Sequence, residues 1–210
     1  MSARTVEEIR NAPLPGEPVY RVAEMLPQQG QWTESTFLRY CLGDSRVEFV
    51  DGNLEFLAVP TRTHQRILFL VAELLRGLVD KAAKGETFVA GYRVRMAGGN
   101  YREPDVVVVL NEHLAETRED FTPHADLVVE VVSTNDPERD WVAKKAEYAA
   151  SGIAEYWIID PRVETLTIFR LDRQTMDYDL ACTCGRNEQV ISPLLGDAGI
   201  SVDEILGPVG

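Results

Sequence analysis

Two acidic residues stand in segments that are otherwise apolar. Asp105 follows Pro104 and precedes the apolar run 106–110, and Glu130 lies inside the apolar run 127–132. Proline cannot donate to a β-ladder, so Pro104 marks the start of a strand and leaves Asp105 at the edge of the sheet. An ionised Glu130 on a buried strand is costly unless a cation, a basic side chain or protonation offsets its charge.

This pair of carboxylates predicts a site for a divalent cation. Two carboxylates close together repel each other and raise a pKa unless a metal ion binds between them. Ligands that are all oxygen favour Mg²⁺ or Mn²⁺ over Zn²⁺. We therefore expect Asp105 and Glu130 to bind such an ion. The alternative, a structural ion pair around a single buried acid, stays open.

A helix expected over residues 136–151 carries a second set of polar residues. Asp140, Lys144 and Tyr148 are spaced i, i+4 and i+8, so they share one face of the helix. An ammonium group that reaches back towards Glu130 can orient water or stabilise charge on a phosphate. The alternatives are a surface ion pair between Asp140 and Lys144 and a Tyr148 that only packs beneath the site.

These segments resemble the Uma-two family of restriction endonucleases, within the PD-(D/E)xK nuclease superfamily. The resemblance runs from about Glu34 to Arg170. It rests on residues 47–52, 64–65, 104–105, 126–133, 140, 144, 148 and 152–161. It implies an α/β fold with a restriction-endonuclease-like core of order αβββαβ, and a mixed sheet with flanking helices and extra antiparallel strands. It also implies a metal-dependent endonuclease that hydrolyses DNA.

The resemblance also assigns roles to residues. The metal ligands for Mg²⁺ (or Mn²⁺) would be Asp105, Glu130, the Val131 carbonyl and Glu48. The catalytic residues would be Asp105, Glu130 and Lys144, and the auxiliary residues His64 and Tyr148.

Three of these assignments have alternatives. The superfamily motif places a lysine two residues after the glutamate, where this chain has Val132. The resembling family has the lysine on the next helix, which corresponds to Lys144, with Lys145 as a less favoured substitute. Glu48 is otherwise an outward-facing strand residue, and His64 a helix-start histidine with local hydrogen bonds.

Composition limits the possible partners and compartments. The net charge of −13 disfavours a protein that coats nucleic acid non-specifically and predicts weak, salt-sensitive DNA binding. The three cysteines are an odd number, which fits a reducing cytoplasm. The sequence shows no apolar run long enough for a membrane span and no secretory signal at its start.

The elements that must position the site follow from periodicity. We expect an N-terminal arm over residues 1–30 and one restriction-endonuclease-like domain over 31–210, with its core at about 62–161. Helices are predicted from Thr33, over 63–83 with a stop at Gly85, and over 136–151 with a stop at Gly152. Strands are predicted at 47–50, 54–59, 87–96, 101–110, 125–133, 155–160, 165–171, 177–183 and 189–191.

Two main hypotheses follow. The first is a Mg²⁺-dependent endonuclease for DNA, in which two copies of the chain pair to cut both strands. The second is a non-catalytic binding or regulatory module that keeps the nuclease fold, with Asp105, Glu130 and Lys144 as a structural ion cluster. A hydrolase of small phosphoesters is a third possibility. The net charge and Val132 favour the second hypothesis, and the presence of all three polar groups favours the first.

Overall fold

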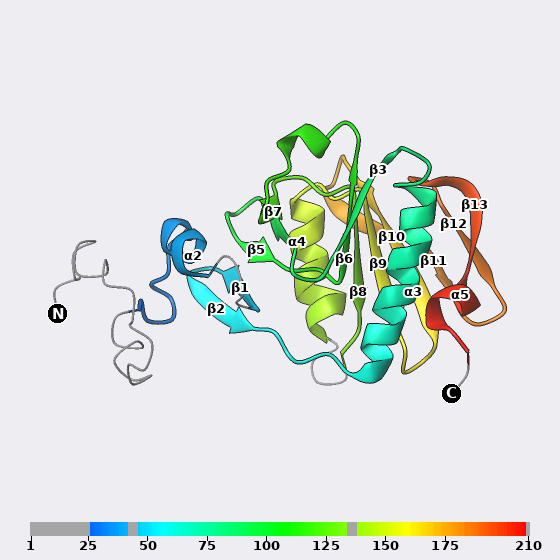
Figure 1. Ribbon diagram of the computed structural model, residues 1–210, viewed down its shortest axis with the longest axis horizontal. Helices are drawn as coiled ribbons and strands as arrows, with labels where there is room; N and C mark the ends of the chain where they lie inside the picture. Colours follow the sequence, from blue (N-terminus) through cyan, green and yellow to red (C-terminus); the bar gives the residue numbers. More distant parts are fainter. Residues whose placement is uncertain (1–25, 42–45, 134–137, 209–210) are drawn as a thin grey trace.

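The computed structural model describes residues 26–41, 46–133 and 138–208 (Figure 1). Most of the expected N-terminal arm and residues 136–137 of the third predicted helix lie outside the described residues. The described strands form a six-stranded sheet, a five-stranded sheet and a two-stranded hairpin. The sequence indicated a mixed sheet, and the structure divides the strands among two mixed sheets and this hairpin.

The large sheet carries the core of the protein. Its strands are, in spatial order, β11 (Asp177–Cys184), β10 (Thr165–Asp172), β9 (Glu155–Asp160), β8 (Leu127–Val131), β6 (Val106–Leu110) and β3 (Gly85–Val89). Strands β8 and β9 are parallel, and every other neighbouring pair is antiparallel. The parallel pair confirms the crossover predicted between residues 125 and 160.

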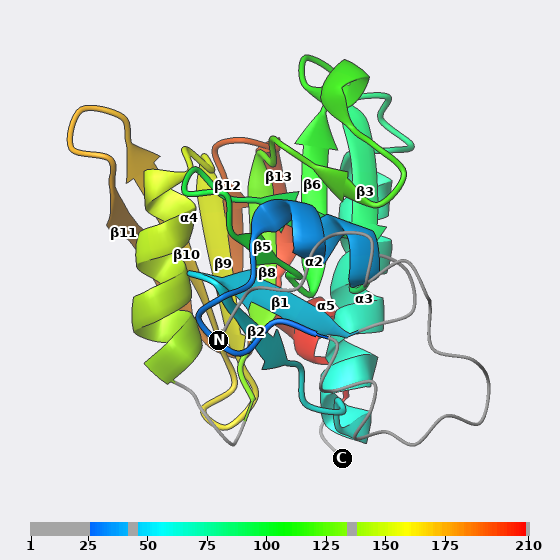
Figure 2. The same cartoon turned by 90° about the vertical axis from the view of Figure 1, so that its left-hand side faces the viewer.

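Helices cover both faces of this sheet, as Figure 2 shows with α4 on one side and α3 on the other. Helix α3 (Arg62–Leu78) packs Ile67, Val71 and Leu75 onto one face. The π-helical turn η2 (Arg139–Lys144) continues into α4 (Lys145–Ala150), which packs Tyr148 and Ala149 onto the other face. The core order α3, β3, β6, β8, α4, β9 is the αβββαβ order expected from the sequence.

The smaller sheet is built from short strands. They are, in spatial order, β2 (Asn53–Phe56), β1 (Val47–Val50), β5 (Tyr101–Arg102), β4 (Arg93–Arg95) and β7 (Phe121–Thr122). Helix α2 (Glu34–Tyr40) begins at the predicted cap Thr33, and its Phe37 ring lies 5.3 Å from Phe49 and 5.2 Å from Tyr101.

The two long strands predicted at 87–96 and 101–110 each split between the sheets. Gly91, at a φ of 103°, separates β3 from β4, and Pro104 separates β5 from β6. Positive φ is a conformation that glycine adopts without strain, and proline cannot continue a ladder as a donor. The chain therefore leaves the large sheet, turns back in the small one, and returns at Asp105. That residue lies where the two sheets meet.

The C-terminal part contains the strand predicted at 189–191 and adds elements that the sequence pattern did not predict. The hairpin of β12 (Gln189–Ser192) and β13 (Gly196–Ser201) leads into α5 (Val202–Leu206), which packs on α3. The remaining element is the short turn η1 (Leu114–Glu116). Cys182 and Cys184 are free cysteines in β11. None of the described helices is long and apolar enough to cross a membrane.

The predicted stop of the long helix at Gly85 is wrong, because α3 ends at Leu78 and Gly85 begins β3. The glycine is required by a close backbone approach instead, since a Cβ at this position would lie 2.2 Å from the Val109 carbonyl oxygen. We expect Gly85→Ala to lower the free energy of unfolding by about 1–3 kcal/mol.

Gly77 provides the matched control, because it lies in α3 with no atom within 4 Å of an added Cβ. Gly77→Ala is expected to stabilise the protein by about 0.5–1 kcal/mol. Urea unfolding of both variants measures the difference. Equal unfolding midpoints for the two variants would show that the contact with β6 is not tight.

Candidate metal centre

Asp105 and Glu130 lie opposite each other on neighbouring strands. Val106 pairs with Val129 in the antiparallel β6–β8 ladder, so one step further along it Asp105 faces Glu130. Directly opposed residues of an antiparallel pair point to the same face of the sheet. The Val131 N–H donates to Asp105 Oδ2 at 2.7 Å, which fixes one carboxylate against the other strand. The two acids therefore converge at one end of the β6–β8 ladder.

The Glu130 carboxylate is buried and has two partners. Lys144 Nζ lies 2.8 Å from Glu130 Oε1, and the Tyr148 hydroxyl donates to the same oxygen at 2.6 Å. Burial raises the pKa of the Glu130 carboxyl to about 8; the charge of Lys144 opposes this rise, and the nearby Asp140 and Asp105 add to it. A bound cation would stabilise the ionised Glu130, because it offsets part of the free-energy cost of burying a negative charge.

Lys144 is surrounded by acids. Its ammonium group also lies 3.2 Å from Asp140 Oδ1. Burial alone would lower the pKa of Lys144, but the carboxylates of Glu130, Glu48 and Asp140 outweigh burial and raise it, so the side chain stays charged. Lys145 points elsewhere, with its Nζ 4.4 Å from the centre of the Phe169 ring. Of the two lysines, Lys144 is the one at the site.

His64 reaches the other carboxylate from the start of α3. Its Nε2 lies 2.9 Å from Asp105 Oδ1. Its backbone N–H donates to the side chain of the cap Thr61 at 3.2 Å. The local hydrogen bond and the contact with the site, which were alternatives for this histidine, are both present.

Tyr148 is fully buried and its ring packs against Tyr156 at 5.1 Å. Burial and the charge of Glu130 raise the pKa of the Tyr148 phenol, so the hydroxyl stays a donor. We expect Tyr148→Phe to fold and to bind Mn²⁺ about 10- to 100-fold more weakly, since groups that orient a metal ligand have effects of this size.

A titration of Mn²⁺ followed by thermal unfolding measures this loss. Tyr178→Phe is the matched control, because the Tyr178 hydroxyl is also buried but donates to the Ile153 carbonyl at 2.8 Å. Equal Mn²⁺ affinities for the two variants would show that Tyr148 does not orient a metal ligand.

Glu48 lies beside this centre in a network of its own. Its Oε1 accepts from the Glu103 N–H at 2.9 Å, and its Oε2 accepts from Arg102 at 2.8 Å and from Arg139. Burial would raise the pKa of Glu48, but the charges of Lys144, Arg102 and Arg139 hold it below its usual value. A metal ion at Glu48 would compete with these three donors for the carboxylate. Its role as a ligand stays a prediction.

Sequence reasoning missed the arginines of this network, although a signal for them exists. The turn at Asp51-Gly52 sets the β1–β2 register, which places Glu48 opposite Glu55. Like charges directly opposed on a hairpin are destabilising and call for a cation between them. Arg102 and Arg139 supply that charge from β5 and η2.

A second group of potential ligands lies at the other end of the β6–β8 ladder. Ligand atoms of Glu112, His113 and Asp126 all lie within 4.8 Å of one another. His113 Nδ1 is 3.0 Å from Asp126 Oδ1, and the His113 ring stacks on that of His124. Any study of cation binding must separate this group from the centre at Asp105.

Comparison with solved structures identifies the class of fold. A crystal structure from Anabaena variabilis, described as a "putative nuclease belonging to DUF820", aligns with a TM-score of 0.69 and 16% sequence identity. The alignment covers 83% of this chain and 97% of that one. The chain therefore has the mixed α/β fold of that structure.

A family model gives the more specific result. The Uma-two (Uma2) model, described as "Putative restriction endonuclease", matches residues 34–203, which is most of the chain. The chain belongs to this family, as the sequence motifs predicted. No curated protein gives a significant match.

Proposed function

We propose that this protein is a divalent-metal-dependent endonuclease that hydrolyses phosphodiester bonds in DNA. The observation that carries the proposal is the placement of Asp105 opposite Glu130, with the Lys144 ammonium group 2.8 Å from Glu130. Membership of a family described as restriction endonucleases supports the reaction class.

The residues present fit a hard divalent cation. Asp105, Glu130 and the Val131 carbonyl would hold Mg²⁺ or Mn²⁺, because all three offer oxygen atoms. Glu48 would add a further carboxylate oxygen, in competition with its hydrogen-bond donors. When bound, the cation supplies charge stabilisation at the phosphate and makes a water molecule more acidic.

The side chains of the protein position the reacting groups. His64 and the Val131 N–H hold Asp105, and Tyr148 holds Glu130. Lys144 stays protonated among its acids, so its ammonium group can donate to the attacking water or to a phosphate oxygen. This arrangement does not need a lysine at position 132, because Lys144 reaches the same carboxylate from the helix.

A cleft gives a substrate access to these groups. It has a volume of about 540 Å³, and Asp105, Glu130 and Lys144 line it. Arg46 and Arg162 also line the cleft and place positive charge near the site. The net charge of −13 still predicts that DNA binding is weak and sensitive to salt. Pairing of two chains to cut both strands remains a prediction.

A cleavage assay tests the proposal. Supercoiled plasmid and linear DNA are incubated with the wild type, Asp105→Ala and Asp179→Ala, each with Mg²⁺, Mn²⁺ or EDTA. Asp179 is an exposed acid in β11 and serves as the matched control. We expect cation-dependent cleavage by the wild type and by Asp179→Ala, and none by Asp105→Ala.

The alternatives give other results. Equal amounts of uncut DNA for all three proteins, with every cation and with EDTA, would support a non-catalytic module that keeps the fold. Asp105-dependent turnover of a small phosphodiester without any cleavage of DNA would support a hydrolase of small phosphoesters.

A further inference from the structure

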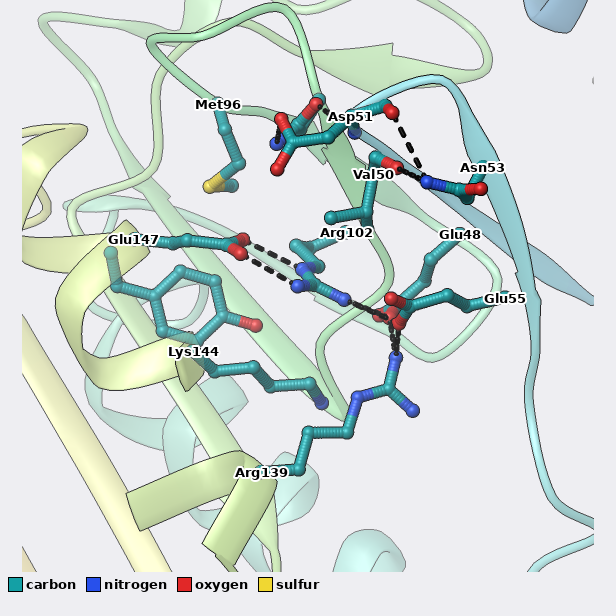
Figure 3. A network of polar contacts seen from close by, with 12 residues as sticks. Glu48, Val50, Asp51, Asn53, Glu55, Met96, Arg102, Arg139, Lys144 and Glu147 are labelled. Atoms are coloured by element: carbon teal, nitrogen blue, oxygen red, sulfur yellow. Dashed lines mark hydrogen bonds and ion pairs between the residues drawn. The ribbon is translucent and has the colours of Figure 1, made fainter. Parts of the chain in front are cut away.

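Arg139 lies at the start of η2 and lines the same cleft as the proposed metal centre. One terminal nitrogen of its guanidinium group contacts the carboxylates of Glu48 and Glu55. Figure 3 shows that the rest of this group points away from those acids. Within the described part of the chain, Nε and Nη1 of Arg139 make no hydrogen bond, and the side chain is 25% exposed. Two of the three guanidinium nitrogens therefore keep N–H donors that have no partner among the described residues.

The carboxylates of Glu48 and Glu55, which contact Arg139, also accept hydrogen bonds from Arg102. Arg102 donates to Glu48 at 2.8 Å and to Glu55 at 3.0 Å. Two further nitrogens of Arg102 each donate to Glu147 at 2.7 Å, so Arg102 lies between α4 and the β1–β2 hairpin (Figure 3). Arg102 is almost fully buried. The network fixes the position of Arg139 before any ligand binds, which lowers the entropy cost of using it.

The free N–H donors of Arg139 suit a phosphate oxygen. Nη2 is taken by Glu48 and Glu55, so neither paired edge of the group is free, but an N–H of Nη1 or Nε can donate one charge-assisted hydrogen bond to a phosphate oxygen. Arg162 lines the same cleft, but its Nε and Nη2 already donate to Asp160 at 2.9 and 2.6 Å. The Nε of Arg46 lies 3.6 Å from Glu103.

The net charge of the ion pairs around Arg139 determines the conditions under which a phosphate would bind there. Glu48, Glu55 and Glu147 contribute three negative charges, and Arg102 and Arg139 two positive ones, a net charge of −1. An anion at Arg139 therefore needs additional positive charge nearby, which Lys144 and a divalent cation at Asp105 and Glu130 would supply. Binding through Arg139 should thus require the cation.

We propose that Arg139 binds a backbone phosphate of the DNA substrate beside the metal centre, and that Glu48, Glu55, Arg102 and Glu147 hold it in position. This inference rests on the proposed nuclease function. It also gives Glu48 a role that does not require it to bind a metal ion.

The test is the salt dependence of binding to a fluorescent DNA duplex with Ca²⁺ in place of Mg²⁺, so that binding is measured without cleavage. The proteins are the wild type, Arg139→Gln, Arg139→Lys and Arg173→Gln, in which Arg173 is an exposed arginine of the β10–β11 turn. For Arg139→Gln we expect about 10-fold weaker binding and a salt slope reduced by about 0.9. Arg139→Lys should also bind more weakly, because its one ammonium group is needed between Glu48 and Glu55 and lysine has no second nitrogen for a phosphate. Arg173→Gln should match the wild type.

The outcomes separate this inference from the function on which it rests. If the wild type cleaves DNA but Arg139→Gln has the wild-type slope and affinity, only the role of Arg139 is overturned. If Arg139→Gln does not fold, Arg139→Lys still decides, because it keeps a cation between Glu48 and Glu55; wild-type affinity in that variant would overturn the inference. A wild type that neither cleaves nor binds DNA overturns both.

Discussion

Lys144→Met is expected to lower the free energy of unfolding of the metal-free protein by about 3–5 kcal/mol under conditions in which Glu130 is ionised. The ammonium group lies 2.8 Å from Glu130 and 3.2 Å from Asp140, and all three side chains are buried. Methionine fills the same space but leaves two buried carboxylates without their cation. Removing one partner of a buried ion pair costs this much because the remaining charge is uncompensated.

The stability lost in Lys144→Met should increase as the pH rises. Burial raises the pKa of folded Glu130 from 4.5 to about 8, so the folded state binds its proton more tightly than the unfolded state. Stability from such a group is present below pH 4.5 and is lost as the pH rises through 8. Without Lys144 the pKa of Glu130 rises further. The deficit of Lys144→Met should therefore be small near pH 5 and largest above pH 8.

Urea unfolding at these two pH values measures the effect. Lys145→Met is the control, because Lys145 lies over the Phe169 ring and has no contact with the centre among the described residues. Adding Glu130→Gln to Lys144→Met should recover much of the lost stability, because it removes the buried carboxylate that has lost its lysine partner. A Lys144→Met protein as stable as Lys145→Met at pH 8 would contradict the geometry of the ion cluster.

Glu130→Gln is expected to reduce cation-dependent DNA cleavage by on the order of 10²-fold or more, as loss of one strong electrostatic group at a reaction centre does. The variant should still fold. Glutamine retains an acceptor for the Tyr148 hydroxyl, and Lys144 keeps Asp140 as a partner. The loss of activity would then come from the missing charge and not from unfolding.

Initial rates of plasmid nicking at saturating Mn²⁺ measure this effect. Glu73→Gln changes an exposed glutamate of α3 and serves as the control. If Glu130→Gln cuts at the rate of Glu73→Gln, then Glu130 does not take part in the reaction.

The sequence predicted the core of the fold because its strands are continuous apolar runs. Residues 106–109 and 127–131 are buried as expected, and this includes Glu130, the acid that suggested a site. Pro104 marked the strand start that brings Asp105 opposite Glu130. The spacing of Asp140, Lys144 and Tyr148 placed them on one helix face, and the structure brings all three to the Glu130 side of the sheet.

Some strands of the smaller sheet and some C-terminal elements were not predictable in the same way. Strands β5 and β7 have two residues each, too few to show any period. Strand β13 contains Gly196 and Gly199, and glycine is depleted in strands. The Arg102–Glu147 and Arg139–Glu48 contacts join residues 45 and 91 positions apart, and no local pattern reports such pairs.

The central proposal is that one divalent cation binds between Asp105 and Glu130. Calorimetric titration of Mn²⁺ into the wild type, Asp105→Asn, Glu130→Gln and His113→Ala tests it most directly, with His113→Ala accounting for the second group of ligands at Glu112 and Asp126. We expect a binding event that both carboxylate variants abolish and that His113→Ala leaves unchanged. Binding that survives in both carboxylate variants, or that disappears only in His113→Ala, would contradict a metal centre at the β6–β8 edge.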